Sequence, residues 1–102
     1  MKNFYLDEKK FDSFVVHPVK WDDSLDREEF YPPVCKRVKE TLTKMLLNEH
    51  ILPEINDRLY LHLGEDIDCE ILGVTAKIDE KTNERRKYCF EVEISVVTLT
   101  FL

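Results

Sequence analysis

Glycine, proline and long apolar runs are all scarce in this sequence of 102 residues. It contains two glycines and four prolines, too few for a disordered, fibrous or glycine-rich phosphate-binding chain. No apolar run exceeds four residues, so no segment is expected to cross a membrane. Residues 1–10 also lack the apolar stretch of a secretory signal peptide. We therefore expect an intracellular, cytoplasmic chain, or a virion-associated one if it is viral.

Cysteine is also sparse, and its spacing excludes the common cysteine-based sites. Cys35, Cys69 and Cys89 are widely separated and form no C-x-x-C pair, so neither a zinc ribbon nor a thioredoxin-like site is predicted. No cysteine or serine has a visible histidine partner among the three scattered histidines. We interpret the cysteines as reduced thiols, mainly packing residues.

Acidic residues outnumber basic ones. The chain has 21 Asp and Glu against 15 Lys and Arg, a formal net charge of −6. Phosphate backbones repel such a protein, so direct nucleic-acid binding is not expected. The simplest role of this charge is to keep the chain in solution.

The clearest periodic pattern is an apolar stripe at helical spacing, with charged residues on the other side. It predicts one long amphipathic helix over about residues 33–49, with Pro33 at the first helical position. Residues 21–31 are expected to form a short helical turn that Pro32 and Pro33 stop. The stripe consists of Val34, Val38, Leu42, Met45 and Leu46.

Alternating and β-branched segments predict strands on both sides of this helix. Phe11–Val16 is the first, and Pro18 should end it or confine it to a sheet edge. Residues 59–63, 67–78 and 87–101 are the others, and the charged stretch 79–86 is expected to be a hairpin tip. A second short turn is expected around Pro53–Asn56, with Ile51, Leu52 and Ile55 facing inward. The prediction is a single α+β domain over residues 1–102, with a mainly antiparallel sheet of three to four strands, the helix packed on it, and the order β(α)αβββ.

Both strands of the last hairpin change their apolar side partway along. Even positions are apolar near the predicted tip, and odd positions are apolar near the base. Pairing residue 78 with residue 88 would place 71 opposite 95 and 69 opposite 97. Two explanations remain open. Coordinated β-bulges at Gly73 and near Val96 would keep one face buried, or the sheet is covered on different faces at its two ends.

The densest polar cluster lies between the second and third predicted strands. Its carboxylates alternate, so three of them could share a sheet face, as a Mg²⁺ or Ca²⁺ site requires. The spacing does not fit an EF-hand, and the lysine of a Glu-x-Lys nuclease site is missing. A solvated acidic turn is the preferred interpretation, with no catalytic residue, metal or cofactor predicted. The cluster comprises Glu65, Asp66, Asp68 and Glu70.

These observations favour a non-catalytic protein–protein interaction module. We expect a small structural or assembly subunit of a larger complex, such as a phage or other multi-subunit particle, that binds a protein partner or itself. Binding would use an edge strand or an exposed apolar sheet face. The aromatic residues before Pro32 are either interface anchors or a lid over the core. The predicted partner-binding residues are Ile67, Ile71, Val97, Leu99, Phe101, Trp21, Phe30 and Tyr31.

Two alternatives come from the acidic residues. The chain could be a small acidic inhibitor or regulator that binds a basic protein surface, for example as a mimic of DNA. It could also be a metal-dependent enzyme that uses the cluster at residues 65–70, which is the weaker hypothesis. The acidic surface of the inhibitor hypothesis comprises Asp57, Glu65, Asp66, Asp68 and Glu70.

Overall fold

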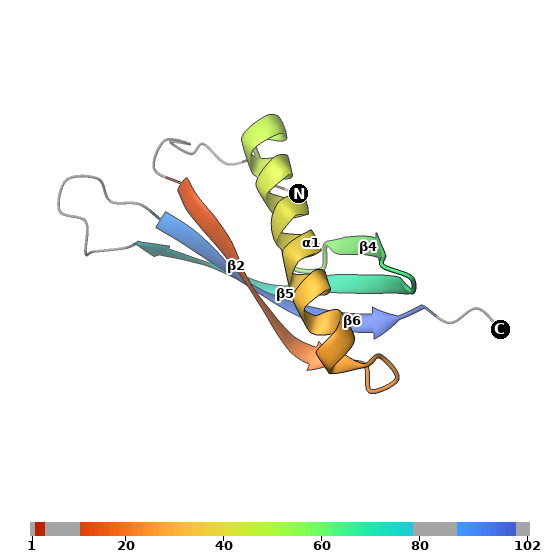
Figure 1. The fold of residues 1–102 in the computed structure, drawn as a ribbon. Helices are drawn as coiled ribbons and strands as arrows, with labels where there is room; N and C mark the ends of the chain where they lie inside the picture. Colours follow the sequence, from red (N-terminus) through yellow and green to blue (C-terminus); the bar gives the residue numbers. More distant parts are fainter. Residues whose placement is uncertain (1, 4–10, 79–87, 100–102) are drawn as a thin grey trace.

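One long helix lies across one face of a twisted four-stranded sheet (Figure 1). The computed structural model describes residues 2–3, 11–78 and 88–99. The predicted hairpin tip at 79–86 and Phe101 therefore lie outside the described residues. The elements are β1 (Lys2–Asn3), β2 (Phe11–Trp21), α1 (Arg27–Glu49), β3 (Ile51–Leu52), β4 (Arg58–His62), β5 (Asp66–Ile78) and β6 (Tyr88–Thr98).

The main sheet has the strand order β2-β6-β5-β4. Strands β4, β5 and β6 pair antiparallel, as consecutive strands joined by short connections do. Strand β2 pairs parallel with β6, because α1 carries the chain back across the sheet between them. The predicted α+β class and the order of elements are confirmed, and the sheet is mixed rather than purely antiparallel.

The helix begins earlier than predicted. Asp26 caps it, its carboxylate accepting a hydrogen bond from the backbone N–H of Glu28 at 3.1 Å. The helix then continues through Pro32 and Pro33, so the predicted stop there was wrong. Proline leaves the carbonyl four residues earlier without its helical partner. Those carbonyls belong to Glu28 and Glu29, which are exposed, so water can satisfy them.

The predicted apolar stripe forms the buried side of α1. Its four fully covered residues rest on the even-numbered side of β6 and on the helix-facing residues of β2 and β5. The helix ends at Glu49, where His50 adopts a left-handed conformation with φ 55° and donates its N–H to Leu46 O. The buried helix residues are Val34, Val38, Leu42 and Leu46.

A single β-bulge resolves the change of apolar side in the hairpin. The ladder pairs Ile78 with Tyr88 and Val74 with Val92, then shifts by one residue between Ile71 and Gly73. Leu72 is the extra residue, so the odd positions of β5 before it lie on the same face as the even positions after it.

Strand β6 has no matching shift in its pairing with β5, so the predicted bulge near Val96 was wrong. Its even residues all face the helix, and Phe90, Val92, Ile94 and Val96 are buried. The bulge in β5 alone places Ile71 opposite residue 94 and Cys69 opposite residue 96, one residue away from the predicted register.

The segments before and after the helix agree with prediction in part. Pro18 does not end strand β2, which runs on to Trp21, and the alternative prediction of an edge strand is confirmed. Residues Ile51–Leu52 form the short strand β3, which pairs with β1 in a separate two-stranded sheet. Leu52 is buried as expected, but Ile55 is 60 % exposed, because it lies in a turn outside the sheet.

The α1 helix carries too many charged residues to cross a membrane, and no helix in the described parts of the chain qualifies as a membrane span.

Candidate functional site

The predicted apolar docking residues do not share one surface. Ile67 and Ile71 have no exposed surface, because the bulge at Leu72 places them under the helix. Val97 lies on the opposite face of the sheet and is 45 % exposed. Leu99 follows β6 and donates its N–H to Asp66 O at 2.8 Å. The described members of this set therefore cannot form one exposed apolar patch.

The aromatic residues before Pro32 pack around the start of the helix. Trp21 donates its indole N–H to the carbonyl of Leu25 at 2.8 Å, and its ring centroid lies 5.7 Å from that of Tyr31. The guanidinium of Arg27 lies 5.0 Å over the Tyr31 ring. Trp21 and Phe30 both pack against the core. Their contacts are those of a lid over the end of the sheet.

Asp22 ties this lid to the end of β6. Its carboxylate accepts hydrogen bonds from the N–H and hydroxyl of Ser24 and from the N–H of Thr98 at 3.0 Å. The Ser24 N–H, followed by the Thr98 N–H, lowers the pKa of Asp22 from 3.8 to about 2. The ionised carboxylate thus connects β2 to β6 across 76 positions of the sequence.

This lowered pKa predicts part of the acid sensitivity of the fold. A depressed folded-state pKa adds stability that is complete above pH 3.8 and disappears as the pH falls toward about 2. Asp22→Asn should remove this component, so its free energy of unfolding should fall less steeply over that range than that of the parent. Denaturant unfolding at a series of pH values measures both slopes. Parallel curves would contradict the assignment.

Two members of the acidic cluster, Asp66 and Asp68, are paired with basic side chains on the neighbouring strand. Arg58 Nη1 lies 2.6 Å from Asp68 Oδ2, and His62 Nδ1 lies 2.8 Å from Asp66 Oδ1. Both bases come from β4, which pairs residue by residue with this part of β5. Asp57 caps a turn by accepting the N–H of Glu54, while Glu65 is exposed in the turn beside Gly64.

These pairs do not favour a metal site or an acidic inhibitor surface at this cluster. Within the described ranges, no three His, Cys, Asp or Glu side chains converge as a metal would need. Asp66 and Asp68, which already pair with His62 and Arg58, also do not form an unpaired acidic row of the kind that a DNA mimic needs. The arrangement does not favour either alternative.

The Arg58–Asp68 pair is expected to stabilise the sheet measurably. Asp68 is only 7 % exposed, and its Oδ1 has no hydrogen-bond partner among the described residues. Arg58→Met would therefore leave a buried carboxylate with no counter-charge, at a cost of about 2 kcal/mol in unfolding free energy. Arg37→Met, on the exposed side of α1, is the control and should cost less than about 0.5 kcal/mol. Equal losses in urea unfolding would contradict the role of the pair.

The face of the sheet away from the helix is mostly polar. Lys77 and His17 flank Glu91 there, with Lys77 Nζ 2.7 Å from a Glu91 oxygen. This Lys77 contact is the largest cause of the lowered pKa of Glu91. The exposed apolar residues on this face, Val15, Tyr60 and Val97, are separated by charged ones. The face of the sheet away from the helix therefore does not support the hypothesis of a second covered apolar face.

The sheet has two edges, and they differ in kind. Strand β4 is short, and its exposed side chains alternate with covered ones. Two of the exposed side chains, Arg58 and His62, pair with carboxylates of β5. A short strand with such side chains is typically protected against unwanted strand pairing. Strand β2 has 11 residues, and no described strand pairs with its outer side. Its pairing with β6 shifts between Phe11 and Ser13 and again between Pro18 and Lys20. The regular part of this open edge is therefore residues 13–18.

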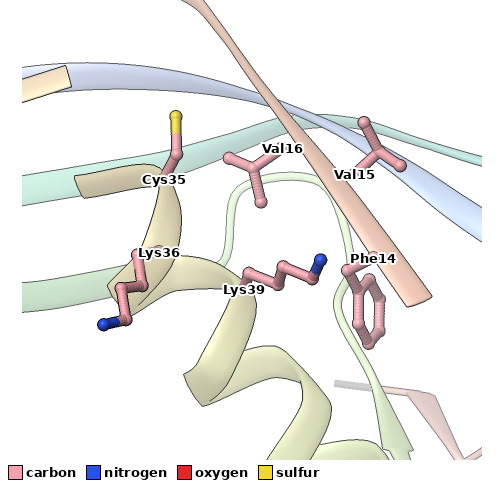
Figure 2. A pocket seen from close by; sticks show the side chains of 6 residues that line it. All are labelled: Phe14, Val15, Val16, Cys35, Lys36 and Lys39. Atoms are coloured by element: carbon pink, nitrogen blue, oxygen red, sulfur yellow. The ribbon is translucent and has the colours of Figure 1, made fainter. Parts of the chain in front are cut away.

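An apolar groove runs beside this regular stretch. Its volume is about 290 Å³, and it lies between β2 and the helix (Figure 2). The Phe14 ring is fixed by the core, with its centroid 5.5 Å from that of Phe90. We call this space the β2 groove. Its lining residues are Phe14, Val15, Val16, Cys35, Lys36 and Lys39.

The described lining of the β2 groove includes two lysines and no acidic side chain. Figure 2 shows the Lys39 side chain extended along the groove toward Phe14, whereas the Lys36 ammonium points away from β2. Neither lysine forms an ion pair with another described residue. Burial raises the pKa of the Cys35 thiol, so it stays protonated at neutral pH and is a poor nucleophile. The groove is suited to binding a segment rather than to covalent chemistry.

Sequence reasoning anticipated the edge but not the groove. Pro18 was expected either to end its strand or to confine it to an edge, and β2 lies at an edge. The groove needs residues 14–16 to meet residues 35–39 in space, and no local pattern encodes that contact. No protein-family model, curated protein or solved structure matches this chain.

Proposed function

We propose that this chain is a non-catalytic protein–protein interaction module that accepts an extended segment of another protein at the outer edge of β2. In this proposal it serves as a small assembly subunit in the cytoplasm and needs no cofactor or nucleic acid. The observation that carries the proposal is the open, regular edge at residues 13–18, with an apolar groove beside it. An added strand would gain backbone hydrogen bonds from the edge and side-chain specificity from the groove.

The two ends of β2 support this placement. A bulge interrupts regular pairing at each end, and bulges discourage the indiscriminate addition of long strands. A segment of about five or six residues fits between them. The net charge of −6 argues against a nucleic-acid partner and is compatible with a protein one.

A random peptide library selected against the purified chain tests the proposal. Selected peptides should be rich in β-branched and aromatic residues, and they should shift backbone amide resonances of residues 13–18 and 35–39. Cys35→Trp fills the groove and should abolish binding, while Leu47→Trp, at an exposed position of the same helix, should not. Thermal unfolding of both variants checks that they remain folded. Resonance shifts confined to β4 or to the polar sheet face would refute the proposal.

A further inference from the structure

We infer that the segment bound at the β2 edge is acidic, with carboxylates placed to meet Lys39 at the groove. This inference rests on the proposed function and adds the chemistry of the partner. Among the residues that the structure describes, Lys36 and Lys39 are the charged side chains that line the groove, and no described carboxylate lines it. The partner is therefore an extended stretch of another protein that combines apolar residues with Asp or Glu on one side.

The geometry gives the two lysines different roles. The aliphatic stem of Lys39 lies along the groove and directs its ammonium toward β2, whereas the Lys36 ammonium is turned away (Figure 2). A strand added beside β2 alternates its side chains, so every second residue faces the helix. Apolar side chains on that side can fill the space over Phe14 and Val16, and a carboxylate two residues farther along can reach Lys39.

The ion pair would form at an exposed rim, so its effect on affinity is modest and depends on salt. Exposed pairs contribute little in water, and they are screened once the Debye length becomes short. Their larger effect is selection among otherwise similar segments, because a like charge at the same place is unfavourable. Lys39 thus acts as a specificity determinant, while the apolar groove and the strand edge supply most of the affinity.

Three end-capped peptides of seven residues test the inference. Each has threonine at positions 2, 4 and 6, valine at positions 3 and 5, and glutamate, glutamine or lysine at both ends, so that the end residues and the valines share one side of the strand. Each peptide is titrated into the labelled chain, and the shifts of the amide resonances of residues 13–18 give its dissociation constant. At an ionic strength of about 0.01 M, the glutamate peptide should bind about fivefold more tightly than the glutamine peptide. At about 1 M the two should agree within about twofold.

Charge reversal supplies the decisive control. Lys39→Glu should invert the order of the glutamate and lysine peptides, whereas Lys44→Glu, at an exposed position of the same helix that does not line the groove, should preserve it. Equal binding of all three peptides at β2 would overturn the acidic preference and leave the proposed function standing. If none of the three shifts the β2 resonances, both the inference and the proposed function fail.

Discussion

Removing Glu93 from the chain is expected to abolish the native fold, whereas removing Leu72 is expected to preserve it. Glu93 lies in β6, which is paired on both sides. Its loss would turn Val92 and Phe90 to the polar face and drive Glu91 into the core. Each buried apolar side chain that is exposed costs about 1.5–3 kcal/mol, and a buried unpaired carboxylate adds several more. The sum is comparable to the whole stability of a domain of this size.

The Leu72 deletion is the matched control, because this residue is the one that the bulge adds. Ile71 would still face Ile94, and Val74 would still face Val92, so the expected loss is less than about 2 kcal/mol. Circular dichroism and thermal unfolding of the two deletions measure the difference. A Glu93 deletion that unfolds cooperatively near the parental temperature would contradict the single apolar face described here.

Leu42→Ala is expected to lower the free energy of unfolding by about 3 kcal/mol. Leu42 has no exposed surface and lies at the centre of the helix side that covers the sheet. Truncation removes its burial and leaves a cavity that the surrounding strands cannot fill. In a domain of about 100 residues this loss corresponds to a melting temperature about 12–24 °C lower.

Leu47→Ala is the control on the same helix. Leu47 is 40 % exposed on the opposite side, so the same chemical change should cost less than about 1 kcal/mol. Urea unfolding of the two variants measures both losses. Similar values would mean that α1 does not pack on the sheet through the stripe at Val34, Val38, Leu42 and Leu46.

Local patterns predicted the elements but not all of their limits. The stripe from Val34 to Leu46 predicted the helix because burial on one side leaves a direct periodic signal. The signal failed at Pro32 and Pro33, since the helix is capped at Asp26 and the residues whose carbonyls lose their helical partners, Glu28 and Glu29, are exposed. Whether the helix tolerates these prolines depends on which residues are exposed in the folded chain, and the residue pattern does not predict that.

The pairing of the strands was harder to predict from the sequence than the limits of the elements. The sequence shows that the apolar positions change from odd to even between Ile71 and Val74. A β-bulge and a second covered face of the sheet produce this same pattern in one strand. The ladder decides for the bulge, because β6 keeps Val92, Ile94 and Val96 on one side without interruption. The parallel pairing of β2 with β6 also depends on the path of the helix.

For the candidate site too, features that depend on neighbouring residues could be predicted, and features that depend on contacts between distant residues could not. Edge-strand binding was among the predicted mechanisms, and Pro18 indicated which strand would be an edge. Two of the apolar residues predicted for docking, Ile67 and Ile71, belong to the core and cannot contact a partner. The β2 groove joins Phe14 to Lys39 across the fold, so only the structure could reveal it.

Amide hydrogen exchange of the labelled chain, with and without the peptide of alternating valine and threonine with glutamate ends, tests the central claim most directly. In the free chain, every second amide of residues 13–17 should exchange rapidly, because no described strand pairs with the outer side of β2. With peptide in excess, exchange at these amides should slow by at least about tenfold, with no change along β4. Unchanged exchange at β2, or protection that appears only at Arg58–His62, would show that the β2 edge is not where this chain binds its partner.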